Sequence, residues 1–236
     1  MASAAVMDAL RALKEGRFIL VYDADGREEE TDMVIASEQV TSETIRLMRR
    51  DGGGLICTTA DPQIRRALGL PFLTDVFNGM AGKYPVMAQL SPNDIPYDVK
   101  SAFGITINHR RTFTGVTDND RALTIKEFAV LAKRAVGSED GWGKDEFGRT
   151  FRAPGHVHLL NTSDRILEDR FGHTELATAL VTMAGLTPSA TVCEMMGDDG
   201  RALSKQAAKE YGRSHGLVFL EGAEVVEAWK EFKGKV

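Results

Sequence analysis

A crowded acidic loop lies between two apolar runs in the stretch Phe18-Ile-Leu-Val-Tyr-Asp-Ala-Asp-Gly-Arg-Glu-Glu-Glu-Thr-Asp-Met-Val-Ile-Ala36. The runs 18–22 and 33–36 have the composition of β-strands, and the loop between them carries six carboxylates and one arginine. Carboxylates at this density repel one another unless a cation lies among them. A surface loop could share this composition, but acidic loops seldom lie tightly between two strands. The stretch therefore favours a functional loop that binds a cation.

The composition is that of a soluble globular protein. The chain has 236 residues, 43% hydrophobic and 27% charged, which is enough for one large domain or two small ones. A net charge of -5 argues against a nucleic-acid binder that works by neutralising phosphates. No apolar stretch reaches the roughly 18 residues of a membrane span, and 4–14 has the rhythm of an amphipathic helix rather than of a signal peptide. We expect a cytoplasmic protein whose two cysteines are reduced, with no nucleic-acid or membrane partner.

Hydrophobic spacing and cap residues predict a mixture of helices and strands without strict alternation. The segments 70–99 and 136–152 lack a clear period, so the first is expected to be irregular and the second a mobile loop. This pattern predicts an α+β fold with one domain over 1–236, in which a mixed sheet lies between helices as a three-layer α/β/α sandwich. Strands are expected over 17–22, 33–36, 55–59, 100–108, 157–160, 190–194 and 217–220, and helices over 4–14, 42–50, 61–69, 125–135, 175–184, 202–214 and 223–232.

A second segment, Arg170-Phe-Gly-His-Thr-Glu175, directly precedes a predicted helix. Backbone N–H groups at a helix start can receive an anion, Gly172 permits close approach, and Arg170 adds a forked donor. Helix capping by Thr174 and Glu175 would explain half of the same residues. A lone histidine such as His173 is more often structural than a ligand, yet an acidic loop elsewhere in the chain favours a metal role.

Three further features carry weaker signals. The polar run Thr114-Gly-Val-Thr-Asp-Asn-Asp-Arg121 could be only a loop and a helix cap, and Arg152-Ala-Pro-Gly-His156 could be only a turn. Cys57 and Glu194 each lie near the end of a predicted strand, where sites often gather, although a buried cysteine is usually inert packing. None of these features identifies a reaction alone.

Taken together, these segments resemble the 3,4-dihydroxy-2-butanone 4-phosphate synthase family, lyases of riboflavin biosynthesis that act on ribulose 5-phosphate. The resemblance covers nearly the whole chain, is closest to archaeal stand-alone members, and leaves no room for the cyclohydrolase half of fused relatives. It rests on the ordered set Asp23-x-Asp-x-Arg-Glu-x-Glu-x-Asp32, Gly54-Leu-Ile-Cys57, Thr114-Gly-Val-Thr-x-x-Asp-Arg-Ala122, Arg152-x-Pro-Gly155, Arg170-x-Gly-His-Thr-Glu175 and Val192-Cys-Glu194.

The chain departs from the bacterial pattern at two places. Bacterial members usually have Arg-Glu-Asn-Glu-Gly-Asp where this chain has Arg27-Glu-Glu-Glu-Thr-Asp32, and Thr-Gly-Val-Ser-Ala-His-Asp-Arg where it has Thr114-Gly-Val-Thr-Asp-Asn-Asp-Arg121. A role carried by that histidine cannot be transferred to Asn119. The acidic and cationic positions are retained, so the implied activity stands.

The resemblance implies a magnesium-dependent rearrangement that converts D-ribulose 5-phosphate to L-3,4-dihydroxy-2-butanone 4-phosphate and formate. It makes Glu28 and His173 the metal ligands; because histidine is an unusual ligand for a hard cation, Mn²⁺ could substitute for Mg²⁺. It also implies a homodimer. The implied acid–base and water-orienting residues are Asp23, Asp25, Glu30, Asp32, Cys57 and Glu194, and the implied substrate-binding residues are Arg27, Thr114, Asp118, Arg152, His156, Arg170 and Thr174.

Two other readings fit part of the sequence. A metal-dependent sugar-phosphate isomerase or aldolase would use the same metal, phosphate cradle and enediol, but would release no formate. An RNA- or nucleotide-binding module of related fold would carry a basic concave surface, and the net charge of -5 argues against it.

Overall fold

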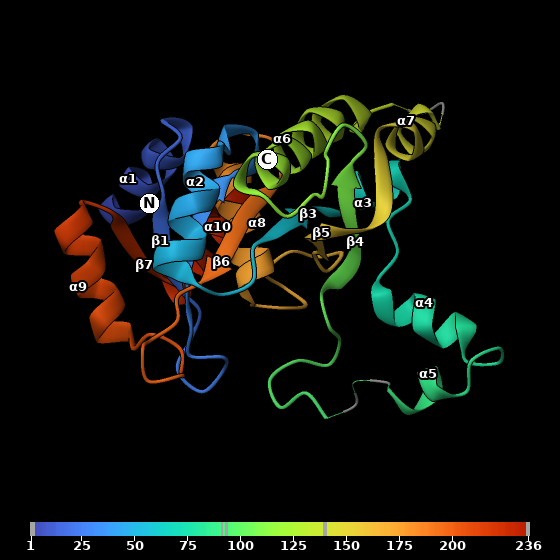
Figure 1. The fold of residues 1–236 in the computed structure, drawn as a ribbon. Helices are drawn as coiled ribbons and strands as arrows, with labels where there is room; N and C mark the ends of the chain where they lie inside the picture. Colours follow the sequence, from blue (N-terminus) through green and yellow to red (C-terminus); the bar gives the residue numbers. More distant parts are fainter. Residues whose placement is uncertain (1–2, 91, 93, 139–140, 235–236) are drawn as a thin grey trace.

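A single mixed sheet runs through the described chain. The computed structural model describes residues 3–90, 92, 94–138 and 141–234, and Figure 1 shows their arrangement. The strand order is β4-β5-β3-β6-β2-β1-β7. Strand β1 is parallel to β7 and β3 is parallel to β5, whereas the other neighbours are antiparallel. The strands are β1 (Ile19–Tyr22), β2 (Thr31–Ala36), β3 (Cys57–Ala60), β4 (Phe103–His109), β5 (Phe151–Asn161), β6 (Ala190–Glu194) and β7 (Val218–Glu221).

Helices cover both faces of the sheet. Their starts follow local capping rules: Thr41, Asp61 and Thr117 each accept a backbone N–H of the first turn. No helix of the described residues has both the length and the apolar composition that crossing a bilayer requires. The helices are α1 (Ala4–Lys14), α2 (Ser42–Leu47), α3 (Pro62–Leu68), α4 (Leu73–Met80), α5 (Val86–Gln89), α6 (Asp118–Ala135), α7 (Trp142–Thr150), α8 (His173–Met183), α9 (Lys205–His215) and α10 (Gly222–Lys233), with a short 3-10 helix η1 (Ser37–Gln39) and a short π-helix η2 (Met48–Gly52).

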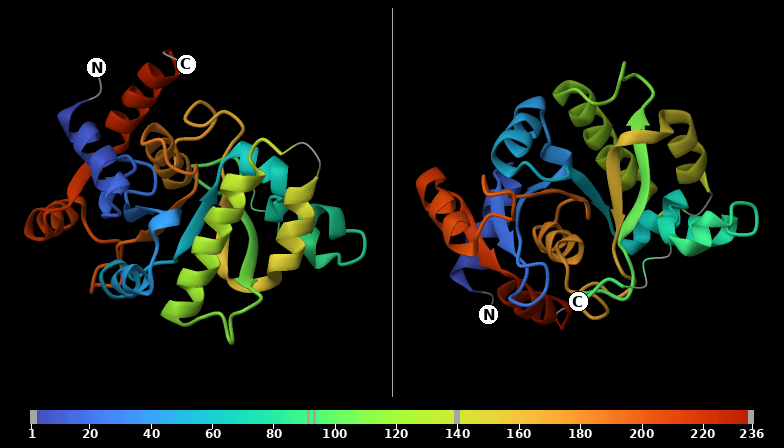
Figure 2. Two further views of the ribbon diagram at one scale, coloured as in Figure 1. Left: turned by 90° about the horizontal axis from the view of Figure 1, so that it is seen from above. Right: turned by 60° about the horizontal axis from the view of Figure 1, so that its bottom comes forward.

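Alternating side chains of the central strands enter two separate cores. In β1, Leu20 packs on one side with α6 and α9, whereas Ile19 and Val21 pack on the other with α1, α8 and α10. All four residues of β1 are buried because both faces are covered. The left view of Figure 2 shows α1, α8 and α10 together on one side of the sheet. The predicted three-layer sandwich with a mixed sheet is confirmed.

Helix α8 positions the candidate site. It packs against β1, β2, β3 and β6, and its residues from His173 to Val181 are all buried. Its first turn lies at the edge of the sheet where β2 and β3 begin and β6 ends. There the backbone pairing sets Asp32 opposite Glu194 and Cys57 opposite Val192. Segments far apart in the sequence therefore meet at one point.

Two segments expected to be irregular contain helices. The segment 70–99 includes α4 and α5, and 136–152 includes α7, so the prediction of loops there was wrong. In α7, Trp142 and Phe147 pack against the core although glycines and charges obscure their period. Helix α6 begins at Asp118 rather than near 125, because its polar first turn is capped by Thr117 and has no apolar signal.

Candidate active site

The acidic loop folds around the buried carboxylate of Asp23. Its Oδ2 atom accepts the backbone N–H of Glu28 and a guanidinium N–H of Arg27, each at 3.0 Å. Its Oδ1 atom accepts the backbone N–H of Glu30 at 3.2 Å. Glu29 has a left-handed backbone with φ 58°, and its side chain accepts the N–H of Gly26 at 2.8 Å. These bonds turn Glu28 inward and Glu29 outward, so neighbouring carboxylates have different tasks.

Glu28 meets His173 at the start of α8. The Oε2 atom of Glu28 lies 3.1 Å from Nδ1 of His173, and Nε2 of His173 lies 3.2 Å from the carbonyl oxygen of Glu30. Burial opposes ionisation of both, yet the pKa of Glu28 falls to about 2 beside His173 and Arg27, and the surrounding carboxylates of Asp32 and Glu28 raise the pKa of His173 to about 9. Ligand atoms of Asp23, Glu28 and His173 all lie within 4.8 Å of one another, which suits a metal ion.

The ends of β2, β3 and β6 supply a second set of titratable groups beside His173, namely Asp32, Cys57 and Glu194. Oδ1 of Asp32 lies 3.6 Å from Nε2 of His173 and has no hydrogen-bond partner among the described residues. Burial raises the pKa of Asp32 to about 8, because the attraction of His173 only partly offsets burial and the repulsion of Glu194 adds to it. Burial also raises the pKa of the Cys57 thiol well above its usual range. Burial therefore favours the protonated forms of both Asp32 and Cys57, and a protonated cysteine is a poor nucleophile.

Glu194 depends on a glycine across the sheet. Its Oε2 atom accepts the backbone N–H of Leu55 at 2.7 Å. A Cβ atom on Gly54 would lie 2.4 Å from that oxygen and 2.8 Å from the Glu194 carbonyl oxygen, so only glycine fits. The run of glycines before β3 thus ends the preceding helix and also admits Glu194 to the site.

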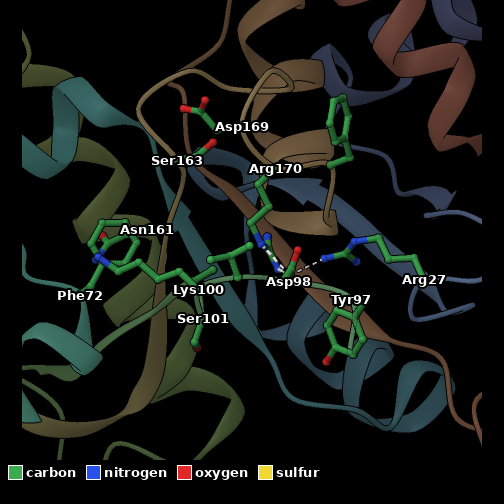
Figure 3. A pocket seen from close by; sticks show the side chains of 13 residues that line it. Arg27, Phe72, Tyr97, Asp98, Lys100, Ser101, Asn161, Ser163, Asp169 and Arg170 are labelled. Carbon is green, nitrogen blue, oxygen red and sulfur yellow. Dashed lines mark hydrogen bonds and ion pairs between the residues drawn. The ribbon is translucent and has the colours of Figure 1, made fainter. Parts of the chain in front are cut away.

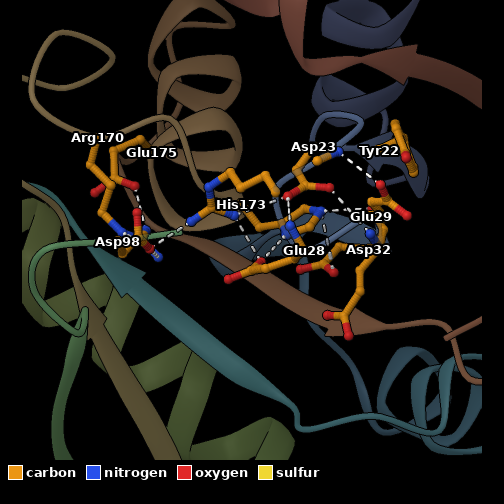
Figure 4. A network of polar contacts seen from close by, with 12 residues as sticks. Tyr22, Asp23, Glu28, Glu29, Asp32, Asp98, Arg170, His173 and Glu175 are labelled. Carbon is orange, nitrogen blue, oxygen red and sulfur yellow. Dashed lines mark hydrogen bonds and ion pairs between the residues drawn. The ribbon is translucent and has the colours of Figure 1, made fainter. Parts of the chain in front are cut away.

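Two arginines lie near the metal-ready cluster of Asp23, Glu28 and His173, and Figure 4 shows one of them, Arg170, beside Asp98 and Glu175. Arg27 also pairs with Glu28 at 2.9 Å, and Arg170 pairs with the fully buried carboxylate of Glu175 at 2.6 Å. Asp98 bridges both guanidinium groups. Thr174 is buried beside them in the first turn of α8. Positive charge, a hydroxyl and a helix start therefore converge beside the carboxylates.

Two adjoining cavities open at this junction. The smaller, about 190 Å³, is lined by residues that include Glu28, Asp32, Cys57, His173 and Glu194. The larger, about 380 Å³, is shown in Figure 3 and extends past Arg27 toward Phe72 and Lys100. Tyr97, Asp98 and Arg170 line both. One cavity thus offers acid–base and metal-binding groups, and the next offers cationic groups.

Comparison with known proteins identifies the family. The model of the 3,4-dihydroxy-2-butanone 4-phosphate synthase family matches residues 7–228. The chain belongs to this family. A protein of that name from Methanothermobacter thermautotrophicus is 50% identical over 97% of each chain, and one from Archaeoglobus fulgidus is 41% identical over 96% of this chain and 94% of the relative. A crystal structure of a 3,4-dihydroxy-2-butanone 4-phosphate synthase with two magnesium ions superposes with a TM-score of 0.74, at 27% identity, over 99% of this chain and 100% of the other.

Most of the residues that the synthase resemblance selects are brought together. Asp25 is an exception: it is exposed, accepts the Tyr22 hydroxyl at 2.7 Å and lies near Lys205, so its position gives the predicted catalytic role no support. The gathered residues are Asp23, Arg27, Glu28, Glu30, Asp32, Cys57, Arg170, His173, Thr174 and Glu194.

Of the remaining predicted substrate-binding residues, Thr114, Arg152 and His156 form a second group at β4 and β5, whereas Asp118 begins α6. Asn108 links this group: its side chain accepts the backbone N–H of His156 at 2.8 Å and donates to the Thr114 carbonyl at 3.3 Å. Arg152 donates to the Thr112 carbonyl at 3.1 Å. Asp118 pairs with Arg49 at 2.9 Å. Within the described residues, no hydrogen bond or ion pair joins this group to the metal-ready cluster, and their predicted roles stay predictions.

Four residues of these two regions were not predicted to belong to the site. Asp98 and Tyr97 lie in a segment without period, and no local pattern marks them. Glu175 belongs to a quoted segment, but its contact with Arg170 and with the Ser163 N–H at 3.0 Å becomes visible only in three dimensions. Asn108 is hidden in the polar end of a strand.

Proposed function

We propose that this chain converts D-ribulose 5-phosphate to L-3,4-dihydroxy-2-butanone 4-phosphate and formate, a lyase step of riboflavin biosynthesis. The observation that carries the proposal is the meeting of Glu28, His173 and Arg170 at one pocket in a member of the synthase family. The test is incubation with ribulose 5-phosphate and Mg²⁺, with formate measured with and without a chelator. Isomerase or aldolase activity would give no formate, so turnover without formate would contradict the proposal.

The donor set fits a hard divalent cation. Glu28 and His173 are the proposed ligands, Asp23 offers a third oxygen nearby, and the unpartnered Oδ1 of Asp32 faces the same histidine. We propose Mg²⁺, with Mn²⁺ able to substitute because one ligand is an imidazole. Bound there, the cation would supply positive charge that stabilises enediolate oxygens.

The acid–base residues are proposed from their burial and charge. The reaction requires removal of a proton from carbon 3 and loss of the hydroxyl of carbon 1. Asp32, whose pKa is about 8, can hold or release a proton near neutral pH, and Glu194 lies beside it. The protonated Cys57 is proposed as a proton donor or polar wall. Glu30, whose pKa is raised by burial and by Glu28, is proposed to orient water or exchange protons.

The phosphate group is proposed to bind at the start of α8. Arg170 and Thr174 supply donors, and Gly172, which provides no side-chain cap, leaves the helix end open. Arg27, held by Asp23, is proposed to bind the substrate together with Arg170. The cavity beside Arg170 has room for a five-carbon sugar phosphate.

The group at β4 and β5 is proposed to serve the site of a second copy in a homodimer. Phe113 and Val116, which flank Thr114, are 94% and 51% exposed, as expected of a surface that another chain covers. In the same dimer, His156 and Arg152 would reach a neighbouring cavity rather than their own. Light scattering of the purified protein tests this: a monomer at micromolar concentration would contradict it.

We also propose one domain over 1–236 and a cytoplasmic location. Support comes from the shared sheet and from both cysteines being free and buried. Localisation of a tagged protein tests the second proposal.

A further inference from the structure

Asp98 occupies the point where the two site arginines meet. Its Oδ2 atom accepts a guanidinium N–H of Arg27 at 2.7 Å and the Nε–H of Arg170 at 2.8 Å, and a second nitrogen of Arg170 lies at 2.6 Å. The Asp98 side chain is 10% exposed, so these ion pairs are largely withdrawn from water. One carboxylate oxygen thus receives the donors of two cationic groups, as Figure 3 shows.

Each arginine also has a nitrogen that is already engaged by a fixed residue. Nη1 of Arg27 is held by Asp23 at 3.0 Å, and Nη1 of Arg170 is held by Glu175 at 2.6 Å. The nitrogens bound by Asp98 are Nη2 of Arg27 and Nε and Nη2 of Arg170. An incoming anion would need the same nitrogens.

The space between the arginines is shaped for an anion. A Cβ atom on Gly172 would lie 2.5 Å from a nitrogen of each arginine, so the glycine lets both guanidinium groups approach the start of α8. No side chain caps that helix end. Two guanidinium groups and an open helix start match the charge and donor pattern that binds a phosphate.

Asp98 lies on a segment that has room to move. Residues 94–102 before β4 form neither helix nor strand. The Cζ atom of Arg27 lies 5.2 Å from the ring centroid of Tyr97, the residue before Asp98. The cavity of about 380 Å³ opens beside Asp98 on the side of Lys100. The carboxylate can therefore leave the arginines without crossing the packed core.

We infer that Asp98 is an internal stand-in for the phosphate of the substrate. Its carboxylate binds the arginine pair when no substrate is bound, and the phosphate displaces it on binding. This inference rests on the proposed function for the identity of the sugar phosphate. The carboxylate neutralises the paired arginines and competes with every anion that enters. A ligand that also engages the rest of the site gains additional free energy for displacing Asp98, so free phosphate binds more weakly than the whole substrate and displaces Asp98 only at higher concentration.

The test compares Asp98→Asn with the wild-type full chain. Asparagine retains the size and an acceptor oxygen but removes the charge. Calorimetric titration with inorganic phosphate at one fixed Mg²⁺ concentration should show binding that is about tenfold tighter, as expected if Asp98 occupies the arginines in about nine of ten molecules. The KM for ribulose 5-phosphate should fall in parallel. Equal or weaker phosphate binding by the variant, or no measurable binding by either protein, overturns the inference.

A matched control separates displacement from a general charge effect. Asp75→Asn removes one carboxylate that pairs with Lys100 at 3.1 Å near the same segment but contacts neither arginine. Its phosphate affinity should equal that of the wild type. A tenfold gain in this control as well would assign the effect to net charge and overturn the inference.

A second measurement does not depend on the folding of the variant. Inorganic phosphate added to the wild-type protein should increase amide hydrogen exchange in 94–102, because the released segment loses its ion pairs. Unchanged or slower exchange overturns the inference. Phosphate binding and exchange are read without turnover, so absent formate in the wild type would refute the proposed function alone.

Discussion

The acidic loop with α8 and the region at β4 and β5 contain the two halves of the predicted substrate and metal residues, and they are organised differently. At the loop, Glu28, His173 and Asp32 converge within hydrogen-bond or ion-pair distance, and their pKa values are displaced in opposite directions. At β4 and β5, His156 and Arg152 are held by neutral backbone and amide groups. The first region therefore holds buried charges whose repulsion and burial shift their pKa values, whereas in the second the two side chains have neutral hydrogen-bond partners.

This difference indicates which kind of partner each region is suited to bind. The loop region gathers negative charge around a buried histidine, so it is satisfied by a cation. In the strand region, Arg152 and His156 have hydrogen-bond partners, whereas the nearby apolar side chains of Phe113 and Val116 are exposed, which is why we propose that a second chain covers this region. Loss of a residue should therefore affect metal binding and chemistry in the first case, and assembly of the site in the second.

The largest effect is expected from removing a metal ligand. Glu28→Ala and His173→Ala should each slow formate release by about a thousandfold or more, equivalent to about 4 kcal/mol of lost transition-state stabilisation. Circular dichroism should show that both variants remain folded. Glu43→Ala, which removes an exposed glutamate of α2 paired with Arg46, is the matched control and should keep its activity. Near-wild-type formate release from either ligand variant would refute the metal assignment.

Co-expression of two inactive variants tests whether the regions come from different chains. If the site is shared, a dimer of His173→Ala with His156→Ala has one intact site, and half of the dimers in an equal mixture are of this kind. About a quarter of the wild-type formate release should return. A mixture of His173→Ala with Glu28→Ala should stay inactive, because both residues belong to the same half. No recovery in the first mixture would mean that β4 and β5 serve their own chain.

The loop half could be predicted from the sequence, because its information is local. Between two strands, the backbone of 23–32 must reverse direction, and the alternation at the strand ends directs Asp32 inward. The acidic loop already favoured a metal role for His173, but the choice of Glu28 as its fellow ligand required the family resemblance, since 145 positions separate the two residues. The layered fold could also be predicted from local information, namely the hydrophobic spacing within each segment.

Other features could not be predicted because they arise from contacts between distant segments. Asp98 lies 71 and 72 positions from the arginines that it joins, in a stretch without periodicity. Helix α7 has Gly143 and Gly148 within it, so packing by Trp142 and Phe147, rather than intrinsic propensity, makes it a helix. Asp25 shares the local pattern of its neighbours but turns outward to Tyr22, which only the loop geometry reveals.

A moderate effect of pH on Mg²⁺ affinity is expected at the acidic loop and α8, because His173 lies there. Because the pKa of His173 is about 9, its imidazole is protonated at pH 7 and must lose the proton to bind Mg²⁺. Apparent Mg²⁺ affinity should rise by up to about tenfold per pH unit between pH 7 and 9, with proton release measurable by calorimetry in buffers of different ionisation enthalpy. A flat affinity over this range would contradict the role of His173 as a ligand.

The same raised pKa has a consequence for stability without metal. The native state holds the His173 proton more tightly than the unfolded chain, whose histidine has a pKa near 6.5. The stabilisation is therefore complete below pH 6.5 and is lost as the pH rises toward 9. Asp32, whose pKa is raised from 3.8 to about 8, gives a trend of the same sign. Denaturant unfolding with chelator present should show the decline, and saturating Mg²⁺ should reduce it.

The smallest effect is expected at Glu29, which lies next to the ligand Glu28 yet turns away from it. Its side chain accepts the Gly26 N–H, so Glu29→Gln retains an acceptor and should keep formate release within about twofold. Glu29→Ala loses that bond and should lower the free energy of unfolding by about 1 kcal/mol, measured by urea unfolding. The backbone at φ 58° is strained in both variants alike, so their difference isolates the hydrogen bond. If Glu29→Gln instead lost activity as Glu28→Ala does, the negative charge at 29 would belong to the metal site, and the division of the loop into inward and outward carboxylates would be wrong.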